Sequence, residues 1–223
     1  FIRRLRDLVG TSSVNPPGDD YSPITAWPTL ELAALGLKSQ RYTLPAALPK
    51  QSLPPEQHRF PRYNVLGRLA AAGARQTLHF NAHYDVVPVS GTWKHGSPFS
   101  GAIAGGWIYG RGTSDMKGSI ASLLLALQAL RATGARPCLN LEVSFTADEE
   151  TDSALGTGWL VEHAPIKPDF AVVMEGGELN QVCCGHNGCL WLEVTVHGRA
   201  AHGSRPDLGI NALEKMAALV GEL

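Results

Sequence analysis

Apolar and polar positions alternate along this chain in two rhythms, one typical of helices and one typical of strands. Near the start and again after residue 22, apolar residues recur at helical spacing, whereas later apolar runs are short and bounded by turn residues. The pattern predicts helices at Ile2–Val9, Pro23–Leu37, along the apolar run Ile120–Leu130 to about Ala132, at Gly156–His163 and from about Ile210 to the end. It predicts strands at Arg41–Leu44, Asn64–Leu69, Thr77–Ala82, Trp107–Tyr109, Leu139–Thr146 and, buried, at Phe170–Met174.

The order of these elements predicts the fold class. Strands that alternate with helices are typical of an α/β fold, with a mostly parallel sheet and helices on both faces. After Glu175 the pattern changes, because Leu190–His197 alternates like a half-buried antiparallel strand and one helix follows. One strand and one helix cannot bury a core of their own. We therefore expect one domain over residues 1–186 and the truncated beginning of a second over residues 187–223.

Composition excludes several classes of function. The 223 residues are 44% hydrophobic, and 19 Lys and Arg balance 20 Asp and Glu, so the chain lacks the basic surface that nucleic acids and anionic membranes attract. The run Ile120–Leu130 is about half of the ~20 residues that cross a bilayer, and we interpret it as a buried helix. No hydrophobic signal core follows the basic first residues, so we expect a cytoplasmic protein.

The four cysteines are too few and too clustered for a secreted disulfide scaffold. Three of them allow a metal-site interpretation, but they lack paired Cys-x-x-Cys spacing. We interpret all four as reduced core or strand cysteines. They are Cys138, Cys183, Cys184 and Cys189.

Metal-type side chains follow three of the expected strands directly. Because the carboxyl ends of parallel strands meet at one edge of a sheet, we expect these side chains to converge. Imidazole and carboxylate groups are ligands of zinc and similar divalent ions. The side chains are His83 and Asp85, then Asp148, Glu149 and Glu150, and finally Glu175.

A further acid, Asp115, lies in a Gly-rich turn directly before the long helix. Gly110, Gly112 and Gly118 surround it, and glycine permits tight backbone conformations that other residues resist. With two oxygens, Asp115 can bridge two metal ions that lie ~3.5–4 Å apart. The alternative is that Asp115 is simply the N-cap of the helix.

The other candidates can be given chemical roles. His83 is a candidate metal ligand, and Asp85 can hydrogen-bond its other ring nitrogen. Of Glu149 and Glu150, one can bind metal while the other acts as a general base toward a metal-activated water. Taken alone, a His-x-Asp pair is often incidental and three consecutive acids often form a solvated turn. Their order at successive strand ends favours a metal site.

Together these motifs resemble the M20 metallopeptidases, which include acetylornithine deacetylases, succinyl-diaminopimelate desuccinylases, aminoacylases and glutamate carboxypeptidases. The resemblance spans about residues 60–215. It rests on His83-x-Asp85-Val-Val-Pro, Gly110-Arg-Gly-x-x-Asp115-Met-Lys-Gly118, Asp148-Glu149-Glu150, Glu175 and Gly198-x-x-x-His202-x-Ser204-x-Pro206-x-x-Gly209-x-Asn211-Ala.

The resemblance implies a zinc-peptidase-like catalytic domain that holds two Zn²⁺ ions, or Co²⁺ in their place. His83 and Glu175 would hold one ion and Glu150 the other, with Asp115 as the bridge. Glu149 would be the general base and Asp85 would orient His83. The implied reaction is hydrolysis of the amide bond of an N-acyl amino acid or small peptide. These roles are carried by His83, Asp85, Asp115, Glu149, Glu150 and Glu175.

Residues 187–223 resemble the start of the family's lid, through which its members form homodimers. His202 matches the lid histidine that polarises the scissile carbonyl. The family's last zinc ligand, a histidine near the C-terminus, has no counterpart here, so we expect this fragment to be under-metallated or inactive. The alternative is a catalytically impaired or non-catalytic relative used for binding or dimerisation, although the presence of Glu149 argues against it. A serine hydrolase is excluded, since the chain has no Gly-x-Ser-x-Gly elbow.

Overall fold

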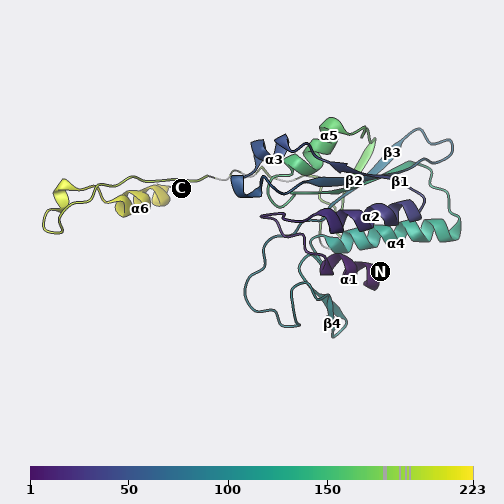
Figure 1. Cartoon of the computed structure of the whole chain (residues 1–223), viewed down its shortest axis with the longest axis horizontal. Coiled ribbons are helices and arrows are strands. Elements are labelled where there is room, and N and C mark those ends of the chain that lie inside the picture. The colour runs from purple at the N-terminus through teal and green to yellow at the C-terminus, as the bar shows by residue number, and fades with distance from the viewer. Residues whose placement is uncertain (178–179, 186, 189, 191, 223) are drawn as a thin grey trace. The chain divides into compact units, whose positions relative to one another are not determined.

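The computed structural model describes residues 1–177, 180–185, 187–188, 190 and 192–222. The protein divides into two compact units, Phe1–Glu178 and Leu179–Leu223 (Figure 1). The boundary expected near residue 187 falls inside the second unit, and the assignment of domains stays a prediction. Among the described residues, no helix has both the length and the apolar character needed to cross a bilayer.

A five-stranded sheet organises the described part of the first unit. Four of its strands point the same way, which confirms the mostly parallel sheet, and β2 runs against them. Only residues 70–76 separate β2 from β3, and so short a connection reverses the chain instead of crossing over to a parallel neighbour. Across the sheet the order is β1 (Lys38–Thr43), β2 (Tyr63–Leu69), β6 (Asn140–Thr146), β3 (Thr77–His83) and β7 (Phe170–Val173).

The register of the sheet brings three strand ends to one edge. His83 is paired with Thr146, so the acids that follow β6 emerge beside the end of β3. On the other side of β3, the N–H of Met174 donates to the main-chain oxygen of Asn81 at 2.9 Å, and Glu175 follows at once. The expected convergence of strand ends is therefore present.

Three helices cover one face of the sheet: α1 (Ile2–Gly10), α2 (Ser22–Ala34) and α4 (Lys117–Thr133) (Figure 1). Each matches an expected helix. α4 ends where Gly134 adopts a φ of +67°, a left-handed conformation that glycine adopts without a Cβ clash. Each large apolar side chain fully buried in this core contributes about 1.5–3 kcal/mol to stability. The core includes Leu8, Ile24, Leu32, Ile120, Leu124, Val143 and Phe145.

Shorter elements cover the opposite face, where Leu66, Leu160 and Ala164 form a smaller core. The helix expected from Gly156 begins as a π-type turn and becomes regular only at Trp159. These elements are α3 (Ala47–Ser52), a 3-10 turn (Pro55–Gln57), the π-type turn (Ala154–Gly158) and α5 (Trp159–His163) (Figure 1). A separate hairpin consists of β4 (Ala102–Ala104) and β5 (Trp107–Tyr109).

Two predictions of burial are wrong. The strand Phe170–Val173 forms, but Phe170 is 51% and Val173 62% exposed, because β7 lies at the edge of the described sheet and pairs only with β3. Cysteines were expected in the core or in strands, yet Cys138, Cys183 and Cys184 are free and exposed in irregular segments. Cys189 lies outside the described residues.

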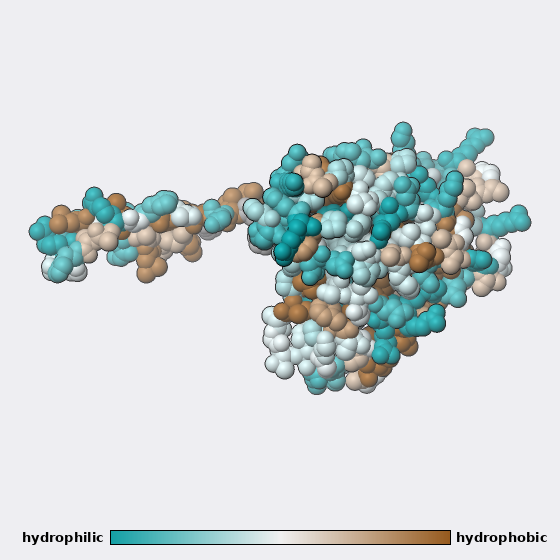
Figure 2. All heavy atoms as spheres, viewed as in Figure 1, coloured by the Kyte–Doolittle hydropathy of each residue, from teal (hydrophilic) through white to brown (hydrophobic). Residues whose placement is uncertain are grey.

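In the second unit, the described residues of the expected strand Leu190–His197 form no strand. Alternating apolar residues make a strand only where a partner strand takes up the main-chain hydrogen bonds, and here Leu192 is 72% exposed. The unit contains an isolated bridge between Arg199 and Ile210, a 3-10 turn (Pro206–Leu208) and α6 (Ala212–Glu222). Figure 2 shows apolar side chains on its surface; Leu213 and Val220 are exposed members of α6.

Candidate active site

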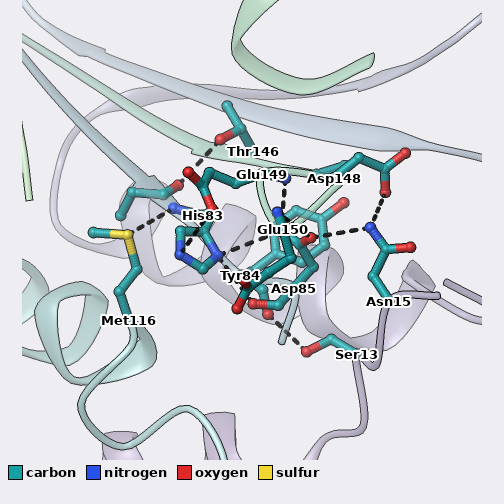
Figure 3. Close-up of polar contacts among 12 residues, drawn as sticks. Ser13, Asn15, His83, Tyr84, Asp85, Met116, Thr146, Asp148, Glu149 and Glu150 are labelled. Atoms are coloured by element: carbon teal, nitrogen blue, oxygen red, sulfur yellow. Dashed lines mark hydrogen bonds and ion pairs between the residues drawn. The ribbon is translucent and has the colours of Figure 1, made fainter. Parts of the chain in front are cut away.

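His83 ends β3 almost wholly buried, with both ring nitrogens close to oxygen atoms (Figure 3). Nδ1 lies 3.0 Å from the main-chain oxygen of Asp85, and Nε2 lies 3.0 Å from Oδ1 of Asp115. A carbonyl oxygen only accepts hydrogen bonds, so Nδ1 carries a proton. In the neutral ring, Nε2 is therefore the nitrogen with an electron pair for a metal ion.

Asp115 and Glu175 form a compact group with His83. One ligand atom from each of the three lies within 4.8 Å of the others, and Oε1 of Glu175 is 3.5 Å from Nε2 of His83. The imidazole is buried, whereas both acids are exposed, so solvent and ions reach the group from its acidic side. One imidazole nitrogen with carboxylate oxygens is a donor set that fits zinc or a similar divalent cation.

The Gly-rich turn holds Asp115 against the end of β3. Gly112 has a φ of +84°, and a Cβ there would lie 2.8 Å from Cγ1 of Val86, so the turn requires glycine. The N–H of His83 donates to Sδ of Met116 at 3.2 Å. α4 has Met116 as its N-cap, without a side-chain capping bond. The alternative interpretation of Asp115 as the N-cap is therefore wrong.

The three acids after β6 have different surroundings. Asp148 is wholly buried, with a φ of +55°, and its Oδ2 accepts a hydrogen bond from Nε of Arg62 at 2.6 Å. Glu149 is half-exposed, and its Oε2 lies 3.8 Å from Nε2 of His83. Glu150 is not a member of the compact ligand group, although it lies close enough for the charge of Asp115 to act on it. The structure thus brings Glu149 beside the ligand group and leaves Asp148 behind it.

Negative charge is concentrated around the imidazole. Burial lowers the pKa of His83, but the surrounding carboxylates, led by Asp85, outweigh burial and raise it to about 9. Burial raises the pKa of Glu150, and the carboxylate of Asp115 adds to the rise. Burial likewise raises the pKa of Glu175, against the opposing effect of His83. Carboxylates that raise one another's pKa mark a surplus of negative charge, which a bound cation would relieve.

Asp85 was expected to orient His83 through its carboxylate, and the geometry gives that carboxylate a second task. Its Oδ1 is 3.4 Å from Nδ1 of His83, farther than the main-chain oxygen. The same carboxylate accepts the main-chain N–H groups of Glu149 and Glu150, each at 3.2 Å. Asp85 therefore ties the end of β3 to the turn that carries both glutamates (Figure 3).

A buried polar network lies behind the acidic turn, and local sequence patterns do not predict it. Arg62 is 0% exposed and pairs with Asp148, while buried Asn15 donates to both Asp85 and Asp148. Arg62 follows an irregular Pro-rich segment and Asn15 precedes two prolines. Both therefore look like exposed loop residues, and no local pattern indicates that they are buried.

His202 belongs to the second unit and is described only within it. Its Nδ1 lies 2.9 Å from Oγ of Ser204, and nearby Arg205 pairs with Asp207 at 2.9 Å. All four residues are exposed. The role of His202 at a scissile carbonyl stays a prediction.

Comparison with known proteins identifies relatives along the whole chain. The chain is 32% identical to an acetylornithine deacetylase from Photorhabdus laumondii over 226 residues, which cover 100% of this chain and 54% of the relative. It is 36% identical to a succinyl-diaminopimelate desuccinylase from Methylorubrum extorquens over 171 residues, which cover 72% of this chain and 43% of the relative. The chain thus spans about half the length of these curated relatives.

Solved structures show the same fold. An M20 family metallo-carboxypeptidase from Sulfolobus solfataricus matches with a TM-score of 0.64 at 22% identity, over 79% of this chain and 37% of the other. Human carnosine dipeptidase 1 matches with a TM-score of 0.60, also at 22% identity, over 77% of this chain and 37% of the other. Residues 79–222, which include all four candidate ligands, match the model of peptidase family M20/M25/M40. This protein belongs to that family of metallohydrolases.

Proposed function

We propose that the complete protein is a zinc-dependent hydrolase that cleaves the amide bond of an N-acyl amino acid or small peptide. The observation that carries this proposal is the group of His83, Asp115 and Glu175, whose ligand atoms lie within 4.8 Å of one another, with Glu149 beside it. A binding protein needs no such additional carboxylate. The presence of Glu149 beside this group therefore argues against the non-catalytic alternative.

In this proposal, Glu150 joins His83, Asp115 and Glu175 as a ligand of the metal. Their imidazole nitrogen and carboxylate oxygens are donors that would hold divalent ions such as zinc. Bound zinc supplies Lewis acidity: it polarises a carbonyl group and lowers the pKa of a water molecule. The hydrogen bond from Nδ1 of His83 to the main-chain oxygen of Asp85 keeps Nε2 turned toward Asp115 and Glu175.

The proton transfers fall to Glu149. Its carboxylate accepts one proton from the attacking water as the water oxygen bonds to the carbonyl carbon. It then donates that proton to the nitrogen as the carbon–nitrogen bond breaks. The products are a carboxylic acid, which keeps the second water proton until it ionises in solvent, and an amine. The short distance from Glu149 to His83 supports this role, because a general base must stand beside the ligand that fixes the reacting centre.

The two relatives described above are named for removing an acetyl and a succinyl group from amino acids, and this supports an acylated amino acid as substrate. A hydrolysis screen tests the proposal. The complete protein is assayed against N-acetyl amino acids, N-succinyl amino acids and dipeptides, with Zn²⁺, with Co²⁺ and with a chelator. We expect metal-dependent release of an amine from one of these classes; hydrolysis that persists in the chelator would contradict the role of the metal.

We also propose that the complete protein is a homodimer through the region that begins at residues 187–223. The exposed apolar side chains of α6, among them Leu213 and Val220, support this proposal, because a helix surface of this kind is usually covered. Sedimentation velocity of the complete protein tests it, and a monomer at micromolar concentration would contradict it.

A further inference from the structure

The loop of residues 11–18 runs beside the end of β3. The N–H of Asn15 donates to the main-chain oxygen of Val86 at 2.8 Å, and the N–H of Val86 donates to the oxygen of Ser13 at 3.0 Å. The hydroxyl of Ser13 donates to the oxygen of Tyr84 at 2.6 Å. These bonds place the loop along residues 84–86, directly next to His83 (Figure 3).

The side chain of Asn15 lies between two buried carboxylates. Its Nδ2 donates to Oδ2 of Asp85 and to Oδ1 of Asp148, both at 3.1 Å, and Oγ1 of Thr151 lies 3.3 Å away. Asp85, Asp148 and Asn15 are each 1% exposed or less. Buried like charges repel strongly in a low dielectric, and an amide that donates to both reduces that repulsion.

Each of the two carboxylates has its own anchor. Asp148 accepts hydrogen bonds from Arg62 at 2.6 Å and from the hydroxyl of Tyr21 at 3.1 Å. Asp85 accepts the N–H groups of Glu149 and Glu150. The amide of Asn15 therefore joins Asp148, which Arg62 and Tyr21 hold in place, to Asp85, which holds the turn of Glu149 and Glu150.

The surroundings of the amide oxygen indicate that Asn15 is needed as a hydrogen-bond donor. Oδ1 of Asn15 is buried and has no hydrogen-bond partner among the described residues. An unsatisfied buried acceptor costs stability. Asparagine at this position is therefore explained by the two hydrogen bonds that its Nδ2 donates.

We infer that Asn15 is a positioning residue that fixes the turn carrying Glu149 and Glu150 by joining Asp85 to Asp148. Within the described part of the chain, the Asn15 side chain forms no hydrogen bond with His83, Asp115 or Glu175, and it acts on them through Asp85. The catalytic consequence rests on the proposed function, whereas the structural consequence does not. With the link removed, Asp85 is free to move away from Asp148, and the two main-chain bonds that orient the turn weaken.

The test compares Asn15→Ala with a matched control, Thr25→Val, in the complete protein. Thr25 is also fully buried, and its hydroxyl donates to the main-chain oxygen of Tyr21 at 2.6 Å within the start of α2. Both substitutions remove buried hydrogen bonds, so both lower the melting temperature. For Asn15→Ala alone, we expect faster amide hydrogen exchange at Glu149 and Glu150. We also expect a fall in kcat on the order of 10- to 100-fold with KM almost unchanged, since a small misplacement of a catalytic group reduces the rate by such factors.

The exchange measurement and the kinetics distinguish failure of the proposed hydrolase function from failure of the positioning role of Asn15. If the wild type hydrolyses nothing in the substrate screen, the proposed function fails, and the exchange rates at Glu149 and Glu150 still decide the role of Asn15. Unchanged exchange at both amides, or an equal loss of kcat in Thr25→Val, would overturn the inference. Should Asn15→Ala not fold, Asn15→Ser retains one donor for one carboxylate, and an intermediate loss of protection is expected; full protection would overturn the inference.

Discussion

Nε2 of His83 lies 3.0 Å from Oδ1 of Asp115, which joins the end of β3 to the Gly-rich turn that precedes α4. His83 is placed by the end of β3, and Asp115 is placed by the tight turn that Gly112 permits. The contact also places the buried imidazole of His83 against Asp115, which is more exposed than Glu149 or Glu175. Together they define where a metal ion would lie.

Replacement of this histidine should abolish tight metal binding. We expect His83→Ala to lower the affinity for Zn²⁺ or Co²⁺ at least about 100-fold, because loss of a ligand has a larger effect than loss of a group that supports a ligand. The control is His163→Ala, which removes an exposed histidine of α5. Isothermal titration of the metal-free protein measures both variants, and equal affinities for the two would contradict the assignment of His83.

The turn around Asp115 should depend on glycine at residue 112. In Gly112→Ala, both the left-handed backbone and the contact with Val86 resist the new Cβ, so we expect a loss of stability of about 1–3 kcal/mol together with weaker metal binding. Gly36→Ala is the matched control, since Gly36 has a φ of +94° but no atom within 4 Å of the added Cβ. It should lose stability alone. Intact metal affinity in Gly112→Ala would show that the turn does not position Asp115.

The buried pair of Arg62 and Asp148 should be essential for folding. Arg62→Met leaves Asp148 charged and buried without its partner, which destabilises a protein by about 3–5 kcal/mol. The double variant Arg62→Met with Asp148→Asn should recover part of that loss, because the uncompensated charge is gone. Urea denaturation measures both, and a double variant that is less stable than the single one would contradict this explanation.

His79 should make the protein sensitive to acid. Burial lowers its pKa below the usual 6.5, although Glu142 opposes this. His79 therefore binds a proton more readily in the unfolded chain than in the folded one. The stability that depends on neutral His79 is fully present above about pH 6.5 and is lost as the pH falls below that value. His79→Gln keeps hydrogen-bonding groups near Glu142 and Ser144 but cannot take up a proton. Unfolding curves between pH 5 and 8 should show less acid destabilisation in this variant than in His163→Gln.

Local sequence patterns predicted the parts of the site that depend on strand ends and turns. His83, Glu149 and Glu175 could be located because each follows an apolar run, and Asp115 because glycines surround it. The direction of β2 was not predictable from periodicity, since it depends on the short turn to β3. The expected strand Leu190–His197 depends on a partner strand, which alternation alone does not supply.

Local sequence patterns do not predict the buried network of Asn15, Arg62 and Asp148, because it depends on contacts between distant parts of the chain. Arg62 and Asn15 are buried only because chain segments distant in sequence meet behind the acidic turn, and Asp148 lies 86 residues from its partner Arg62. Burial of a charged residue is a property of tertiary contacts. The residues on either side of Arg62 in the sequence therefore do not indicate that it is buried.

Glu149 is the proposed general base of a metal-dependent hydrolase. The most direct measurement is the hydrolysis rate of the complete, zinc-loaded protein and of its Glu149→Gln variant, with the metal content of both determined. We predict that the variant keeps its metal and loses activity on the order of 10²–10⁴-fold, as expected for removal of a general base. Unchanged hydrolysis in a fully metallated Glu149→Gln variant would contradict the claim.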